Sequence, residues 1–109
     1  MKPENIKAQM RKGILELCIL KLLDNKERYP AEIITSLKAS ELIVVEGTLY
    51  PLLNRLKRAG VLDYRWEESD SGPPRKYYTV TEFGKHFVNE LEKTWSALQK
   101  AVQQSENPK

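Results

Sequence analysis

The segment "GTLYPLLNRL", residues 47–56, limits the possible folds most, because a regular apolar stripe runs along one side of it. Four leucines recur at i, i+3, i+4 and i+7, which is the spacing of one face of an α-helix. They are Leu49, Leu52, Leu53 and Leu56. Gly60 follows as a natural left-handed cap, so we expect the helix to end there with its leucine face in a protein core.

The other side of this helix is polar and basic when its residues are projected at about 100° per residue. The projection places Tyr50, Pro51, Asn54, Arg55 and Arg58 on that side or beside it. Pro51 leaves no intrahelical bond unmade if the helix begins near Thr48, whose hydroxyl would then cap it. One bond is lost if the helix begins nearer Glu46, and a third interpretation is that Pro51 only ends a loop. In both helical interpretations Gly47 and Pro51 give the leading end a slim, stiff tip.

Two further helices are expected before this one. Residues 5–25 are apolar on almost every side over their second half, so that helix must be covered from several directions. Pro30, preceded by Tyr29, suits the first position of a short second helix that runs to about Ala39.

A β-hairpin is expected after the leucine-striped helix. Residues 61–68 alternate in polarity as a strand does, "SDSGPP" signals a turn, and "RKYYTVT" alternates again. Tyr78 and Tyr77 would therefore point to opposite sides. The hairpin would carry Arg75 and Lys76 just past its tip.

A last helix is predicted from about residue 82 to 103, with an apolar stripe along it. The stripe consists of Phe83, Phe87, Leu91, Trp95, Leu98 and Val102. Its later steps of 4, 3 and 4 residues are typical of a helix packed along another helix. We expect a dimer interface, made by Phe87, Leu91, Trp95, Leu98 and Val102 together with Ile6 and Met10 of the first helix. The alternative is packing within one chain, against the first helix.

Trp95 lies midway along the stripe, where two copies related by a two-fold axis come close to each other. Two indoles across an apolar gap could sandwich a flat ligand, which would make Trp95 an effector-binding residue. The alternative is that Trp95 only fills the interface.

The composition argues against catalysis. The 109 residues suffice for one domain, and the single Cys18 and single His86 supply neither a Cys-His couple nor a metal cluster. We predict no enzyme activity, no metal and no cofactor. The net charge of +3 is only mildly basic, so any contact with nucleic acid must come from local clustering. The sequence contains no leader or long apolar run, and we expect a soluble, cytoplasmic protein.

Three helices, a hairpin and one more helix are the element order of a winged helix-turn-helix module with an added C-terminal helix, a mainly α (α+β) fold. In such a module the third helix enters the major groove of DNA, and the hairpin, or wing, lies on flanking phosphates. Asn54 suits a base edge, whereas Arg55 and Arg58 could contact base or backbone. The expected division is residues 1–80 as the DNA-binding module, 81–103 as a dimerisation helix and 104–109 as a disordered tail.

The segments "GTLYPLLNRLKRAGVL" and "GPPRKYYTVTEFG" resemble the PadR family of bacterial transcriptional regulators, and the similarity covers about residues 8–100. With one C-terminal helix the chain resembles the short subfamily. The resemblance implies a homodimeric DNA-binding repressor, often relieved by small aromatic or otherwise hydrophobic compounds. It implies recognition-helix positions at Thr48, Tyr50, Pro51, Asn54 and Arg55, and wing positions at Arg75, Lys76 and Tyr77.

Two departures from the family pattern bear on DNA affinity. Val44-Val45-Glu46 stands where a small polar residue is common, and Pro73-Pro74 stands where another Arg is common. Both predict modest non-specific binding. A homodimer would read a roughly palindromic operator. The alternative from another class is a winged-helix protein-interaction module without DNA binding, whose basic third helix docks an acidic partner.

Overall fold

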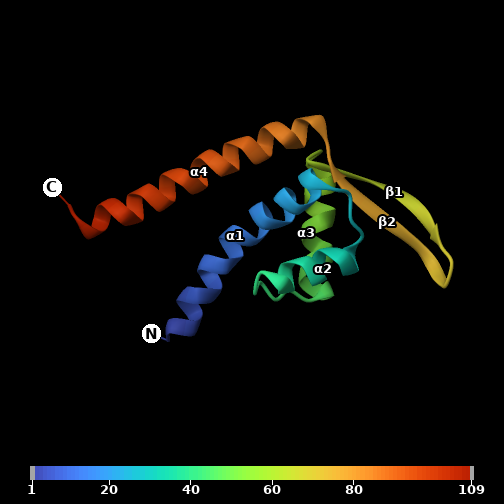
Figure 1. The fold of residues 1–109 in the computed structure, drawn as a ribbon, viewed down its shortest axis with the longest axis horizontal. Coiled ribbons are helices and arrows are strands. Elements are labelled where there is room, and N and C mark those ends of the chain that lie inside the picture. The colour runs from blue at the N-terminus through green and yellow to red at the C-terminus, as the bar shows by residue number, and fades with distance from the viewer. Residues whose placement is uncertain (1, 109) are drawn as a thin grey trace.

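The computed structural model describes residues 2–108, in which four helices and a two-stranded antiparallel sheet follow the predicted order (Figure 1). The elements are α1 (Pro3–Asn25), α2 (Pro30–Ala39), α3 (Glu46–Arg58), β1 (Leu62–Ser69), β2 (Gly72–Val80) and α4 (Glu82–Glu106). The prediction of a winged helix-turn-helix with an added C-terminal helix is confirmed. In this part of the chain no helix is both long and apolar enough to cross a membrane.

The core lies where the second half of α1 meets α2, α3, the root of the hairpin and the start of α4. Its buried side chains are Ile19, Leu20, Leu23, Ile33, Leu37, Val44, Leu49, Leu53, Leu56, Val61, Leu62, Tyr78, Val80 and Val88. Full burial contributes about 1.5 to 3 kcal/mol for each leucine, so the buried leucines of α3 fix which of its sides faces out. The start of α1 and the end of α4 extend away from this core on the side opposite the wing (Figure 1).

α3 begins earlier than a cap at Thr48 would require. Its first residue is Glu46, and the preceding Val45 offers no side-chain cap. The alternative in which Thr48 caps the helix is therefore wrong, and the Thr48 backbone N–H donates to the Val45 carbonyl at 3.0 Å. Pro51 lies inside the helix and cannot make the bond to the Gly47 carbonyl. Of the three interpretations of Pro51, the correct one is that the helix begins at Glu46 and loses one backbone hydrogen bond at Pro51.

α2 and α3 end with the same left-handed turn. Gly60 has a φ of 80° and donates its N–H to the Lys57 carbonyl at 3.0 Å, which confirms the cap predicted there. After α2, Glu41 adopts this conformation with a φ of 63°, and Leu42 donates its N–H to the Leu37 carbonyl at 2.9 Å. A residue with a Cβ is strained in this region by about 1 kcal/mol, so Glu41 is a weak point of the fold.

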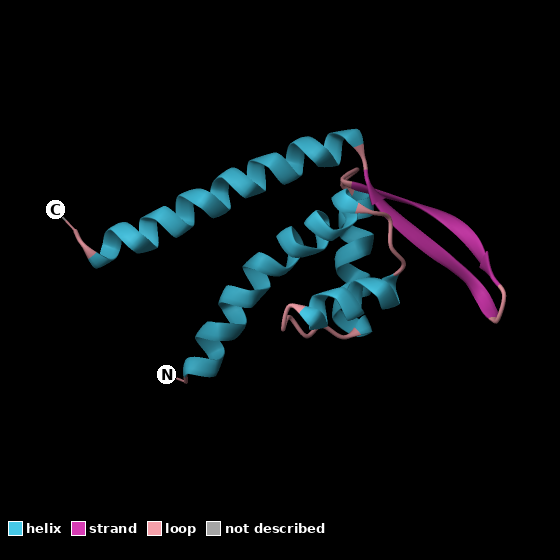
Figure 2. Ribbon diagram, viewed as in Figure 1, coloured by secondary structure: helices cyan, strands magenta, loops and turns pink. Residues whose placement is uncertain are grey.

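β1 and β2 form the wing, which extends away from the three-helix core (Figure 2). The turn itself is residues 70–71, because the Gly-Pro-Pro segment that follows belongs to β2. Arg75 and Lys76 pair with Glu67 and Trp66. The expectation that the two basic residues lie just past the tip is therefore wrong. Strand pairing resumes beyond an irregularity near the turn, which moves the tip outward and leaves both cations farther back on the wing.

α4 begins as predicted and ends later. Thr81 caps it, since the Thr81 hydroxyl accepts a hydrogen bond from the Gly84 N–H at 2.9 Å. The helix continues to Glu106, so residues 104–106 are helical rather than part of a disordered tail. No helix-breaking residue interrupts this segment before the penultimate proline, which explains the difference. The last residue of the expected tail, Lys109, lies outside the described residues.

Candidate nucleic-acid interface

The outward face of α3 brings together the recognition residues that the sequence predicts. All six of them are exposed on this one helix: Thr48, Tyr50, Pro51, Asn54, Arg55 and Arg58. The buried leucines on the opposite side of α3 hold them there. Asn54 presents an amide donor and a carbonyl acceptor to solvent, which is the pair of groups that an adenine edge requires.

The two outward arginines of α3 have different surroundings. The Arg55 guanidinium donates to the Glu16 carboxylate of α1 and forms an ion pair with it. Arg58 is exposed in the last turn, next to Lys57, whose Nζ lies 3.7 Å from Asp63 Oδ1. Sequence reasoning missed Glu16, which interrupts the apolar run of α1 and gives no local sign of its partner. A ligand that binds Arg55 must therefore compete with Glu16.

Arg75 and Lys76 project from opposite faces of the wing, because successive residues of a strand alternate. Lys76 Nζ lies 4.4 Å from the ring centre of Tyr64 and 5.2 Å from that of Trp66. The Arg75 guanidinium lies 4.3 Å from the ring centre of Tyr29. Cation–π contacts of this kind hold long side chains in place without neutralising their charge. Both cations can still bind a phosphate.

Tyr77 shares the Arg75 face, and it points away from the buried Tyr78 as predicted. Its ring centre lies 5.4 Å from that of Tyr29 in an edge-to-face arrangement. The Arg65 guanidinium lies 4.9 Å from the ring centre of Tyr77. Tyr77 is therefore half-buried between the wing and the start of α2. A contact of Tyr77 with phosphate stays a prediction.

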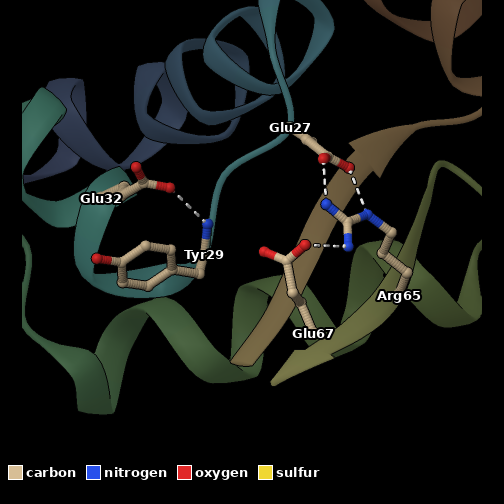
Figure 3. A network of polar contacts seen from close by, with 5 residues as sticks. All are labelled: Glu27, Tyr29, Glu32, Arg65 and Glu67. Carbon is tan, nitrogen blue, oxygen red and sulfur yellow. Dashed lines mark hydrogen bonds and ion pairs between the residues drawn. The ribbon is translucent and has the colours of Figure 1, made fainter. Parts of the chain in front are cut away.

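Arg65 joins the wing to the connection between α1 and α2 (Figure 3). Its Nε donates to Glu27 Oε2 at 3.0 Å, and its Nη1 donates to Glu67 Oε1 at 3.1 Å. The hydrogen bond from Arg65 lowers the pKa of Glu27, and the two carboxylates raise the pKa of Arg65 above its ordinary value. Sequence reasoning missed the pairing of Arg65 with Glu27, because the two residues are 38 positions apart in the chain. The alternation of residues 61–68 indicated only that Arg65 and Glu67 share one face of a strand.

The outer part of the wing is acidic and apolar. Between Trp66 and Arg75 the sequence has no Lys or Arg, whereas it contains Glu67, Glu68 and Asp70. The positive charge of the wing is therefore concentrated in its middle, at Arg65, Arg75 and Lys76.

A second exposed surface runs along α1 and α4. A groove of about 460 Å³ lies between them. Its apolar lining includes Met10, Ile14, Leu17, Leu91, Trp95, Leu98 and Val102. Met10 is 66% exposed, Leu98 56% and Trp95 37%, so this chain leaves the groove largely uncovered. Of the other predicted interface residues, Phe87 packs partly against the core and Ile6 lies outside the groove lining.

A helix with a polar outer face, followed by a hairpin wing and a long helix with an uncovered apolar stripe, defines the class of winged helix-turn-helix transcriptional regulators. Residues 19–90 match the family described as "Transcriptional regulator PadR-like family". The chain belongs to this family, whose members are transcriptional regulators rather than enzymes.

Similar proteins match along almost the whole chain. The PadR-like transcription factor of Bacteroides fragilis is 55% identical, with 91% of this chain and 96% of that chain covered and a TM-score of 0.77. A PadR family transcriptional regulator from Eggerthella lenta DSM 2243 is 29% identical, with 97% and 93% covered and a TM-score of 0.88. An uncharacterized protein of Lysinibacillus sphaericus is 30% identical over 100 residues, covering 89% of this chain and 92% of its own.

Proposed function

We propose that the chain is a homodimeric, sequence-specific DNA-binding repressor that reads the major groove with α3. The observation that carries this proposal is the exposed polar and basic face of α3, held outward by buried leucines. Asn54 is suited to an adenine edge, and Arg58 to guanine or phosphate. Arg55 can join them once DNA replaces Glu16 as its partner. In this role the protein acts in the bacterial cytoplasm.

The leading end of α3 and the wing supply the contacts to the DNA backbone. Thr48, Tyr50 and Pro51 form the leading half of the face, where the N–H groups at the helix start favour a phosphate. Glu46 in the first turn opposes this attraction. Arg75, Lys76 and Tyr77 are the wing positions that meet flanking phosphates. The mixed charge supports modest non-specific affinity and greater dependence on base contacts.

A second copy of the chain is the proposed occupant of the groove between α1 and α4. Exposed apolar side chains from both helices gather there, and burying them against an identical surface is favourable. A two-fold axis through this surface would present two α3 helices about 34 Å apart and match a roughly palindromic operator.

A small hydrophobic or aromatic effector is proposed to bind at the same interface, between the two copies of the chain. The groove of one chain has a volume of about 460 Å³, within the range of small-molecule sites, and the Trp95 rings of the two copies offer faces for stacking on a flat ligand. An effector bound there would change the spacing of the two α3 helices and so relieve repression.

Selection of bound fragments from a pool of random duplexes tests the proposal. We expect the selected sequences to share a roughly palindromic motif, and binding to weaken as salt is raised because phosphate contacts release counterions. Recovery of fragments with no shared motif would contradict sequence-specific reading by α3.

A protein-interaction module is the second candidate, and one observation favours it. Ile43 is 80% exposed and Val45 is 63% exposed, directly before the leading end of α3. Exposed apolar side chains at this place suit a protein partner better than a phosphate backbone. If no duplex is retained even at low salt, the interaction module replaces the DNA-binding proposal.

A further inference from the structure

The wing is fastened along one edge to the connection between α1 and α2. Arg28 and Tyr78 exchange backbone hydrogen bonds, at 3.2 Å from the Arg28 N–H and 2.9 Å from the Tyr78 N–H. The residues on either side of Arg28 are Glu27, which binds Arg65, and Tyr29, which stacks on Tyr77. Three consecutive residues of this connection thus contact both strands of the wing.

We infer that Arg65 and Glu27 form a clamp that sets the angle of the wing for DNA binding, and that Arg65 is a positioning residue rather than a phosphate contact. The inference rests on the proposed DNA-binding function. Arg65 is shared between two carboxylates, so a phosphate would have to displace Glu27 and Glu67 to reach it.

The clamp acts on Arg75 through a continuous stack. Arg65 lies over Tyr77, Tyr77 meets Tyr29 edge to face, and Tyr29 carries Arg75 on its ring. Arg65 thus holds one end of the stack in place, while Arg75 at the other end is exposed and can bind a phosphate.

A two-stranded hairpin has little stability of its own, so its direction depends on what it packs against. The root of the wing is buried, but its outer half projects beyond the core (Figure 1). Arg65 lies in the middle of the wing opposite Tyr77, and Lys76 and Arg75 are one and two pairs farther out. A contact at Arg65 that turns the hairpin about its root therefore moves both cations relative to the DNA. An exposed ion pair adds little to folding stability and can still matter for this alignment.

The experiment compares two substitutions that each remove one negative charge. Glu27→Gln breaks the clamp, whereas Glu68→Gln removes an exposed carboxylate farther out on the wing. Charge alone predicts tighter binding to DNA for both, because each makes the protein more positive. The clamp predicts that Glu27→Gln binds the selected operator about three- to tenfold more weakly, while Glu68→Gln binds equally well or more tightly.

The sign of the Glu27→Gln effect decides between the two roles of Arg65. If Arg65 were a phosphate contact held back by Glu27, removing Glu27 would release it and tighten binding. Equal or tighter binding by Glu27→Gln therefore overturns the inference. Circular dichroism melts of both variants ensure that the comparison is between folded proteins.

A double-mutant cycle completes the test. Arg65→Gln alone is expected to weaken binding as Glu27→Gln does, and the double variant should bind about as weakly as either single variant. Additive losses would mean that the two residues act separately and would overturn the clamp. Failure of the unmodified protein to bind any duplex would instead refute the proposed function, so the two failures are distinguishable.

Discussion

Replacing Gly84 with alanine is expected to destabilise the protein where α4 meets the wing root. A Cβ at this position would lie 2.1 Å from the Val61 carbonyl oxygen and 2.7 Å from Val80 Cγ1. Ordinary contacts are longer by about 1 Å or more, so either α4 or the turn after α3 must move. Overpacking of this kind typically costs about 1 to 3 kcal/mol, and the overlap with a backbone atom places Gly84→Ala near about 3 kcal/mol.

Helix propensity predicts the opposite sign, which makes the experiment decisive. Alanine is favoured over glycine in a helix by up to about 1 kcal/mol, so without the close contact Gly84→Ala, in the first turn of α4, would stabilise the helix. Gly47→Ala in α3 is a matched control, because nothing lies within 4 Å of a Cβ built there. We expect Gly47→Ala to leave the free energy of unfolding unchanged or to raise it by up to about 1 kcal/mol.

Urea unfolding followed by circular dichroism measures both variants against the unmodified chain. A Gly84→Ala protein as stable as the original, or more stable, would show that α4 does not approach the wing root this closely. Such a result would contradict the close packing of Gly84 against Val61 and Val80.

Three further substitutions test other parts of the molecule. Asn54→Ala is expected to weaken binding to the selected operator by about 1 to 3 kcal/mol and binding to random DNA far less, as measured by fluorescence anisotropy; equal losses would mean that Asn54 does not read bases. Leu98→Asp should leave the protomer folded, since Leu98 is 56% exposed, but shift it to monomer in sedimentation velocity because a charge cannot be buried unpaired; a persistent dimer would place the interface elsewhere. Glu41→Gly should raise the free energy of unfolding by about 0.5 to 1 kcal/mol, because glycine accepts the φ of 63° without strain; a less stable variant in urea would contradict a left-handed Glu41.

The predictions from sequence were accurate where the determinants are close together in the chain. Pro30 begins α2 and Gly60 follows α3 because proline and glycine act on their own turn of backbone. The sequence leaves the first residue of α3 undecided, because both Glu46 and Thr48 are acceptable near a helix start. In the fold the helix begins at Glu46 and has no side-chain cap. The position of Arg75 differs from the prediction because the Gly-Pro-Pro segment, which reads as a turn, belongs to β2, and strand pairing continues outward to Gly72.

The sequence by itself determined the order of the elements, the buried face of α3 and the residues on its outer face, because helical and strand periodicities are recorded within a few residues. Only the tertiary structure decided that Glu16 pairs with Arg55 and that Glu27 holds Arg65. These partners are 39 and 38 residues apart, and a charge on one helix or loop carries no local mark of the charge it will meet. The packing of α1 and α3 and the pairing of the wing with the α1–α2 connection bring them together.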